Sequence, residues 1–492
     1  MNIIRKVVFG AVAMLLPAAS SFAQDTAPGE AETVITLQDA VKIALSENVS
    51  VRVANMEIQR AEYNKKGSYA ALYPQVTGVG TFQRTIKKQV MYMDGMSGGS
   101  ILGSYFEPII TALEENGIHV DMNPSGGGDS GDEGGGSSSS EGISVGRWNT
   151  WSGGINATMP LVNAQLWQSL KISGKSVELA VEQARSSRLE AVTQVKQAYF
   201  SVLLAKEAFK VYKDVYENAF ENLAQVQRKY DVQKVSELEL TRAKSNLASA
   251  IPNVYNAESS VILALWQLKA VMGVDLDMNI DVAGSLTDYA EHMFYDIHEH
   301  DNFNVDLNTT MRQLAIQAEQ LATSVKMQKY AYLPTLSVAF SYTMNAMTND
   351  FKFSEYRWTP YSYVGLTLSI PIFTGGKRHY DVKNAKLQAA ELDLRRSDTE
   401  RQLKISIRQF LNTMETSMKS YTSSEEAVEL ARKAYDISQK SYKVGKSTLT
   451  DLHDAELVLT QARLASSQAI FNFVNAKASL EQVLGKDFIT TE

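Results

Sequence analysis

Apolar and small residues recur in alternating steps of three and four between Arg378 and Leu484, a stretch with almost no helix-breaking residues. Such steps average a 3.5-residue period, which places one stripe along one side of a coiled-coil helix. The stripe before Gly445 consists of Leu403, Ile407, Phe410, Met414, Ser417, Tyr421, Ser424, Val428, Ala431, Tyr435, Ser438 and Tyr442. Because the break at Gly445 is short, a second helix is expected to return antiparallel to the first. The pattern predicts a very long helical hairpin, whose first helix spans roughly 100 Å.

The same pattern occurs a second time, earlier in the chain. Tyr230 to Lys234 resembles Tyr442 to Lys446, and Val271 to Gly273 resembles Val483 to Gly485, at one shared offset. At that offset the stripe residues also correspond: Phe209, Tyr212, Tyr216, Ala219, Leu223, Val226 and Tyr230 fall on Tyr421, Ser424, Val428, Ala431, Tyr435, Ser438 and Tyr442. The sequence therefore predicts two halves with one plan: helix, strand, loop, strand, long helix, tight turn, helix.

Two segments of the second half alternate between large apolar residues and small or hydroxylated ones. From Leu336 to Met344 every even position is large and apolar, and the segment from Val364 to Ile370 follows the same rule. A transmembrane β-strand of about 9–11 residues has this pattern, although an ordinary half-buried antiparallel sheet would show it too. Four strands cannot close a barrel, and open sheet edges do not occur in lipid. The strands are therefore expected to pool between subunits, so that three protomers give twelve strands.

The predicted boundaries follow from these patterns. Residues 24–302 form the first structural repeat, with a helix from about Leu37 to Ala71, a strand from about Val76 to Lys88, an insert over 91–146, a strand from Trp148 to Met159, a helical hairpin over 164–272 and a connector over 274–302. Residues 303–492 form the second repeat, with a helix, strands over 335–345 and 361–370, and a helical hairpin over 378–484. The insert is rich in Gly, Ser and acidic residues, which do not build a core.

The ends and the composition of the chain limit its partners and its location. Residues 1–23 have a basic start, a short apolar run and a small-residue cleavage site, which is typical of a secretory signal peptide. The alternative is a membrane anchor, but the apolar run is too short to span a bilayer. The net charge of −7 and the absence of a basic stripe argue against nucleic acid. The chain has no cysteine, so it has neither disulfides nor thiolate chemistry.

Two segments resemble the TolC family of outer-membrane efflux proteins. One runs from Gly365 through Pro371 to Gly376, and the other from Tyr442 to Leu452. The resemblance covers essentially the whole mature chain and implies an α+β membrane protein. Three internally duplicated protomers, each with four transmembrane β-strands, would share a 12-stranded barrel, and their antiparallel helical hairpins would form a periplasmic α-barrel. The family members are passive exit ducts of the outer membrane, for drugs or other small molecules in tripartite efflux pumps or for proteins in type I secretion. The implied partners are a homotrimer, a periplasmic adaptor (membrane fusion) protein, an inner-membrane RND or ABC transporter and outer-membrane lipid.

The resemblance also assigns residues to a periplasmic gate. Asp451 and Asp454 match the family's gate carboxylates, and Tyr442 and Glu239 match positions that hold neighbouring helices closed. Spacing alone favours ordinary N-terminal acids that interact with the helix dipole; the gate is what the resemblance implies.

Other matched residues mark the turns and hinges. Gly445, Thr448 and Gln233 fall in the helix-tip turns, and Pro371, Gly375, Gly376 and Pro160 mark the strand-to-helix hinges. Two departures from the family pattern are Ser447, where some members carry an arginine, and Gln233, where a glycine is usual. Glutamine in a left-handed conformation costs about 1 kcal/mol or more, so a different geometry is expected for the first turn and a different lock for the closed state.

No residue pattern indicates catalysis, a metal site or a cofactor. The spacing of His292, His298 and His300 fits no metal-binding pattern, so these residues are expected in a solvated connector. Asp129, Asp132 and Glu133 lack a calcium-loop pattern, and Gly375-Gly376 is not part of a phosphate loop. An enzyme is therefore not expected. The alternatives to an exit duct are a periplasmic coiled-coil scaffold without a pore and a surface receptor that uses the insert.

Overall fold

The computed structural model describes residues 33–91, 143–294 and 305–486. The expected signal peptide and most of the expected insert lie outside the described residues. The chain divides into two compact units. The helical unit comprises Met1–Gln59, Glu178–Ile316 and Asp393–Glu492, and the sheet unit comprises Arg60–Val177 and Gln317–Leu392.

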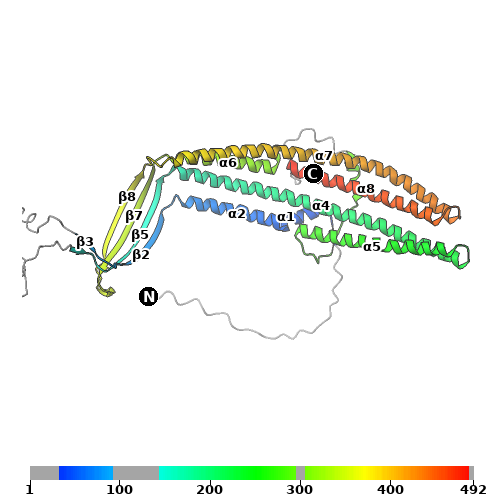
Figure 1. Cartoon of the computed structure of the whole chain (residues 1–492), viewed down its shortest axis with the longest axis horizontal. Coiled ribbons are helices and arrows are strands. Elements are labelled where there is room, and N and C mark those ends of the chain that lie inside the picture. Colours follow the sequence, from blue (N-terminus) through cyan, green and yellow to red (C-terminus); the bar gives the residue numbers. More distant parts are fainter. Residues whose placement is uncertain (1–32, 92–142, 295–304, 487–492) are drawn as a thin grey trace, which may run out of the picture. The chain divides into compact units, whose positions relative to one another are not determined.

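Two helical hairpins make up most of the helical unit. The first consists of α4 (Ala164–Asp231) and α5 (Glu237–Met272), and the second consists of α7 (Lys377–Lys443) and α8 (Leu449–Leu484). Figure 1 shows the two members of each hairpin running side by side to a turn. The stripe residues Ile407 and Met414 are almost completely buried, so the 3.5-residue period marks the packed side of α7.

The single helix expected from Leu37 to Ala71 is wrong, because the structure has two helices there. These are α1 (Leu37–Glu47) and α2 (Val49–Ala70), with Asn48 between them. The Asn48 amide oxygen accepts hydrogen bonds from the backbone N–H groups of Ser50 and Val51, and its Nδ2 donates to the carbonyl oxygen of Val271 at 2.7 Å. The side chain therefore caps a new helix and anchors it to the end of α5.

Asn308 has the same role at the start of α6 (Thr309–Tyr330). Its amide oxygen accepts from the backbone N–H groups of Thr310 and Met311, and its Nδ2 donates to the carbonyl oxygen of Val483 at 2.6 Å. The two asparagines thus join the end of each hairpin to the helix that precedes the first strand of each half, α2 or α6.

Glycine is required where these helix ends meet. Gly485 ends α8 with a φ of +66°, and a Cβ placed on it would lie 2.4 Å from the carbonyl oxygen of Leu307. Gly273 ends α5 in the same way, where a Cβ would lie 2.7 Å from the carbonyl oxygen of Glu47. A larger residue at either position would strain the backbone and also collide with its neighbour.

The connector after α5 contains regular structure and buried side chains in its described part. Residues Ile280–Val282 form β6, which pairs in parallel with β1 (Thr33–Ile35), and two short 3-10 helices follow at Leu286–Tyr289 and Glu291–Phe294. Leu286 and Met293 are fully buried in the main hydrophobic core. Residues 295–304, with His298 and His300, and the side chain of His292 lie outside the described part. A third 3-10 helix, Val305–Leu307, leads into α6.

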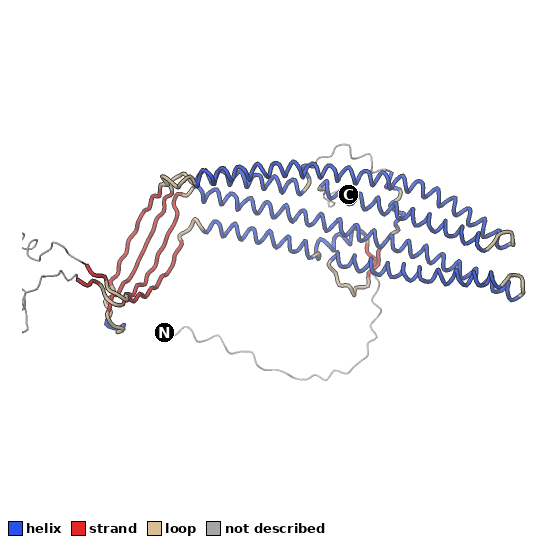
Figure 2. Tube along the Cα trace, in the orientation of Figure 1, coloured by secondary structure: helices blue, strands red, loops and turns tan. Residues whose placement is uncertain are grey.

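The sheet unit contains four antiparallel strands in the order β2-β5-β7-β8 (Figure 2). They are β2 (Gln75–Arg84), β5 (Asn149–Val162), β7 (Thr335–Thr348) and β8 (Thr359–Ser369). β7 extends three residues beyond the expected strand, and β8 begins two residues earlier than expected. At the base of the insert, β3 (Gln89–Met91) pairs with β4 (Ile143–Val145). No helix in the described ranges is both long and apolar enough to cross a membrane.

Gly485→Ala is expected to destabilise the protein more than Gly445→Ala does. Both glycines have positive φ values, but the space around Gly445 is open. Both substitutions incur the left-handed backbone cost of about 1 kcal/mol, and only Gly485→Ala adds the collision with Leu307. Thermal unfolding followed by circular dichroism measures the difference. Equal melting temperatures for the two variants would contradict the close approach at Gly485.

Candidate functional site: the tips of the helical hairpins

A small hydrophobic cluster joins the ends of the two hairpins. Its buried members come from all four long helices: Val226, Leu240, Ala243, Tyr435, Tyr442, Leu449 and Leu452. This cluster is separate from the main core of the helical unit. The two tips are therefore held together locally, by the stripe residues Val226, Tyr435 and Tyr442 and by apolar residues of α5 and α8 that lie outside the predicted stripes.

The two tip turns have the same geometry. Gly445 has a φ of +77° and Gln233 a φ of +57°. In the second turn the N–H of Lys446 donates to the carbonyl oxygen of Ser441, and in the first the N–H of Lys234 donates to that of Lys229, both at 2.8 Å. These bonds are typical of a helix that ends in a left-handed residue. The expectation of a different first turn is therefore wrong: Gln233 adopts the strained conformation.

The helices that follow the turns both begin with a hydroxyl N-cap and an acid three residues later, but the two acids have different partners. Thr448 caps α8 by accepting from the N–H of Asp451, and the Asp451 carboxylate accepts from the N–H of Thr448 at 2.8 Å. Ser236 caps α5 by accepting from the N–H of Glu239. The Glu239 carboxylate, however, accepts a hydrogen bond from the Tyr442 hydroxyl at 3.0 Å. Glu239 thus connects the two hairpins, whereas Asp451 closes its own capping box.

Tyr442 lies at the centre of this connection. Its side chain is buried, and the Lys229 ammonium lies 4.8 Å from the centre of its ring. Burial, and then the hydrogen bond to Glu239, raise the pKa of Tyr442, so its hydroxyl remains protonated and able to donate at neutral pH. The sequence pointed to both residues, and the structure brings them together.

Asp451 and Asp454 are both exposed on the first turns of α8. The hydrogen bonds with Thr448 lower the pKa of Asp451, so this carboxyl is ionised at neutral pH. Within the described residues, neither aspartate forms an ion pair. Asp451 therefore has the ordinary capping role that its position predicts, and both carboxylates remain open to solvent. Ser447 binds its own chain, since its hydroxyl donates to the carbonyl oxygen of Ser438 at 3.3 Å.

A buried carboxyl lies one turn further along α8, and the sequence reasoning missed it. Glu456 is 7% exposed and accepts a hydrogen bond from the Asn218 amide of α4 at 3.0 Å. Burial raises its pKa to about 7, and the hydrogen bond from Asn218 opposes part of this shift. The acid occupies a polar position beside the apolar stripe, and its burial depends on a residue more than 200 positions away. In the sequence, the polar residues of α4 that face this position were the only indication that Glu456 is buried.

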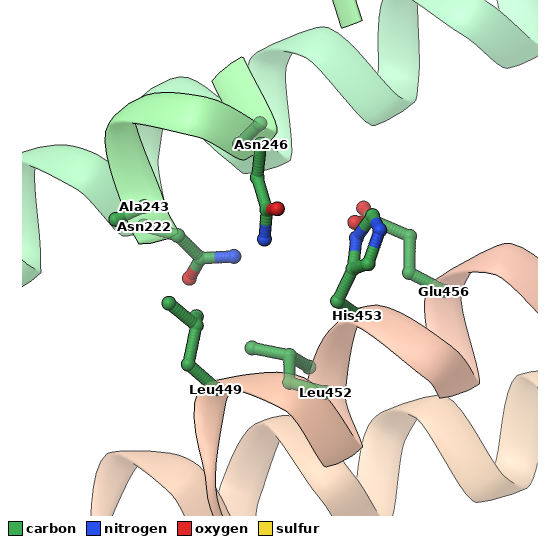
Figure 3. Close-up of a pocket in the computed structure, with 8 residues that line it drawn as sticks. Asn222, Ala243, Asn246, Leu449, Leu452, His453 and Glu456 are labelled. Atoms are coloured by element: carbon green, nitrogen blue, oxygen red, sulfur yellow. The ribbon is translucent and has the colours of Figure 1, made fainter. Parts of the chain in front are cut away.

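Glu456 borders a small cavity between α4, α5 and α8. The cavity holds about 10 Å³, roughly the space of one water molecule. In Figure 3 the amides of Asn222 and Asn246 face the side chains of His453 and Glu456 across this space. The interior of the tip is therefore polar on one side and apolar at Leu449 and Leu452 on the other.

The expected hinge residues occupy two kinds of position. Gly375 and Gly376, with φ values of +59° and +79°, form the turn between β8 and α7, and the Pro371 carbonyl accepts from the Arg378 guanidinium at 3.3 Å. Pro160 lies inside β5, next to a shift in its register with β7, rather than in the connection to α4. That connection is Asn163, whose amide oxygen accepts from the N–H of Leu166 and caps the helix.

Comparison with known proteins identifies the relatives of this chain. A family model described as outer membrane efflux protein matches residues 123–274 and 306–486, which is more than half of the chain. Outer membrane protein TolC of Escherichia coli (strain K12) is 21% identical over 351 residues, covering 68% of this chain and 70% of that protein. Alkaline protease secretion protein AprF of Pseudomonas aeruginosa is 23% identical over 345 residues, covering 69% and 70%. The CmeC outer membrane channel of Campylobacter jejuni has a TM-score of 0.65 at 18% identity, covering 96% of this chain and 94% of CmeC.

Long paired helices combined with a small antiparallel sheet are the fold that this chain shares with the CmeC channel. No group of three or more His, Cys, Asp or Glu side chains that could hold a metal ion occurs in the described ranges. The chain belongs to the outer membrane efflux protein family. It is an outer-membrane exit duct with a periplasmic helical part, as the resemblance implied.

Tyr442→Phe is expected to loosen the tips, because it removes the hydrogen bond to Glu239 and leaves a carboxylate without its donor. Hydrogen bonds to charged groups contribute about 1.5–3 kcal/mol. Amide hydrogen exchange should therefore accelerate around residues 230–240 and 440–452. Tyr255→Phe on the exposed side of α5 is the matched control and should leave both segments unchanged. Unaltered protection in Tyr442→Phe would show that the hydrogen bond is dispensable.

Glu456→Gln is expected to remove a pH dependence of stability. The unfolded carboxyl ionises near its ordinary value of 4.5, whereas the folded one keeps its proton until about pH 7. This stabilising contribution is complete below pH 4.5 and is lost as the pH rises through 7, a change of about 3 kcal/mol. The difference in free energy of unfolding between wild type and variant cancels the groups that both share. Glu429→Gln, at an exposed position on α7, should keep the wild-type slope. Parallel pH profiles for wild type and Glu456→Gln would contradict the burial of a protonated acid.

Proposed function

We propose that three copies of this chain form the passive exit duct of a tripartite efflux pump. Their sheets pool into a twelve-stranded barrel in the outer membrane, and their hairpins form a periplasmic α-barrel. The observation that carries the proposal is the open sheet: in the described part, β2 and β8 each pair on one side only. Lipid offers no partner to an unpaired strand edge, so such a sheet is completed by sister subunits. Residues 1–23 act as the secretory signal that brings the chain to the periplasm.

The two faces of the sheet support this arrangement. One face carries exposed apolar side chains, among them Phe340, Val364, Leu366 and Leu368. The other face is polar, and its side chains bind one another across the strands: Ser341 donates to Asn156 at 2.7 Å, and the hydroxyls of Thr81 and Ser152 are in contact. In a membrane barrel the apolar face meets lipid and the polar face lines the pore.

The hairpin tips serve as the periplasmic gate. Three copies place six carboxylates, Asp451 and Asp454 of each subunit, around one axis. Such a ring repels anions and attracts divalent cations. The bond between Tyr442 and Glu239 keeps the two hairpins of one subunit together, so that opening breaks or moves this contact. A periplasmic adaptor protein and an inner-membrane RND or ABC transporter supply the cargo and the energy.

The second candidate is the exit duct of a type I protein secretion system. The similarity to AprF, which is named for the secretion of alkaline protease, favours it. Both functions use the same duct and differ in the pump that docks to it. Deletion of the protein separates them: increased sensitivity to drugs, detergents or metals supports efflux, and the loss of a secreted protein without such sensitivity supports secretion.

Membrane fractionation tests the duct itself. The protein should co-purify with the outer membrane, run as a heat-modifiable trimer and conduct ions in planar bilayers. A monomer that remains in solution without detergent would contradict the proposal.

The double variant Asp451→Asn/Asp454→Asn is expected to reduce block of the channel by divalent cations and to raise single-channel conductance. Asparagine at position 451 retains an oxygen that can accept from the N–H of Thr448, so charge is removed while the cap is kept. Glu426→Gln/Glu429→Gln, at exposed positions on α7, removes the same number of charges elsewhere and should behave as wild type. A conductance and a cation block unchanged in the aspartate variant would rule out their role as a gate.

A further inference from the structure

The sheet has a distinct rim at the end away from its helices. The helices join the strands at Gln75, Val162, Thr335 and Ser369, and the opposite strand ends are Arg84, Asn149, Thr348 and Thr359. Residues 82–91, 146–151 and 345–360 are here called the rim. If the sheet spans the outer membrane as proposed, with the helices in the periplasm, the rim lies at the outer leaflet.

Aromatic rings form a continuous platform on the rim. Trp151 lies 4.2 Å from Phe82 and 4.6 Å from Phe353, and Phe353 lies 4.9 Å from Tyr356 (ring centres). Phe351 adds a further ring 6.1 Å from Phe82. Phe82 and Trp151 are in register with Ala346, which shares the apolar face of β7 with Phe340. The platform therefore belongs to the face that is proposed to meet lipid, at the position of an interfacial aromatic belt.

Two cations lie over aromatic rings of the rim, without a carboxylate partner among the described residues: one over the platform and one over the separate ring of Trp148. The Arg84 guanidinium lies 5.9 Å from the centre of the Phe351 ring, and the Lys88 ammonium lies 4.9 Å from that of Trp148. The rim is also basic in a chain whose net charge is −7. Its basic residues are Arg84, Lys87, Lys88, Arg147, Lys352 and Arg357, and its acidic residues are Asp350 and Glu355.

A cavity of about 560 Å³ opens beside Arg84 and includes Trp148, the ring over which Lys88 lies. It is lined by Arg84, Thr85, Ile86, Trp148 and Asn349. Ile86 is 95% exposed, and Trp148 is also partly open to solvent. The cavity thus combines a phosphate-binding guanidinium, a hydroxyl and an amide with an indole and an aliphatic chain.

We propose that the rim binds the phosphorylated head group of a glycolipid of the outer leaflet. Arg84 and Lys88 bind phosphate, the indole of Trp148 packs against a sugar ring, and Ile86 meets the acyl chains. An amphiphile fits better than free phosphate, because apolar side chains adjoin the cations: Phe351 lies beside Arg84, and Ile86 and Trp148 line the cavity. The inference rests on the proposed function, since only a membrane-spanning sheet brings the rim to that leaflet.

Native mass spectrometry of the full-length protein in detergent tests this site. The probe is a bisphosphorylated, acylated glucosamine disaccharide, compared with its dephosphorylated form, phosphatidylglycerol and inorganic phosphate. Arg84→Gln/Lys88→Gln should weaken binding of the bisphosphorylated probe by about tenfold or more, because it removes two charge-assisted contacts. The matched control is Lys65→Gln/Lys66→Gln on α2, where Lys66 also lies over a ring, that of Tyr63 at 5.6 Å. This control should bind as wild type does.

Three results would overturn the inference: equal binding of the probe by wild type and Arg84→Gln/Lys88→Gln, equal binding of the dephosphorylated lipid or phosphatidylglycerol, or displacement of the probe by an equal concentration of inorganic phosphate. Trimer formation and conductance of the variants are measured in parallel. If both persist while lipid binding fails the test, the rim site is wrong and the duct stands. If wild type itself neither assembles nor conducts, the proposed function is wrong.

Discussion

An unpaired strand edge cannot be left in hydrocarbon, because each exposed N–H and C=O group there has no partner. The described sheet has such an edge on both sides, at β2 and at β8. If the sheet lies in the outer membrane, as proposed, its two edges need partners from outside the protomer. The proposed pooling of three sheets satisfies the edges, makes one face a pore lining and the other a lipid surface, and sets the number of hairpins that surround the pore.

The helical unit meets a related requirement by different means. Long helices with a narrow apolar stripe are not stable singly, so each must be fixed along its length by neighbours. Asn48 and Asn308 fix the helix ends beside Gly273 and Gly485 by short contacts. The far tips are fixed by a small cluster, by the hydrogen bonds of Tyr442 with Glu239 and of Asn218 with Glu456, and by the contact of Lys229 with the Tyr442 ring. The helical unit therefore has its larger core away from the tips and a smaller set of contacts at the tips, which suits the gate proposed at that end.

Periodicity alone predicted the elements whose packing is regular. The 3.5-residue stripe located both hairpins, and alternation located the strands, because one buried face determines each pattern. Features that depend on distant partners were missed. In the sequence, Asn48 looks like any residue inside a helix, because its partner, the carbonyl oxygen of Val271, is more than 200 positions away. The buried Glu456 likewise has a distant partner, the amide of Asn218. Gln233 was expected to avoid the left-handed region, but the turn requires that conformation and the neighbouring contacts outweigh its cost.

The most direct test of the account uses the absence of cysteine from the chain. Each variant carries two introduced cysteines, one at a position within residues 77–81 of β2 and one within 363–367 of β8. The variant proteins are then oxidised while they are in the membrane. Two strands separate these positions within one protomer, so their backbones lie roughly 14 Å apart, beyond the reach of a disulfide. The account predicts covalent dimers and trimers on non-reducing gels, with cross-linking strongest at every second position. A scan of all these pairs that gives only monomers would contradict the shared sheet.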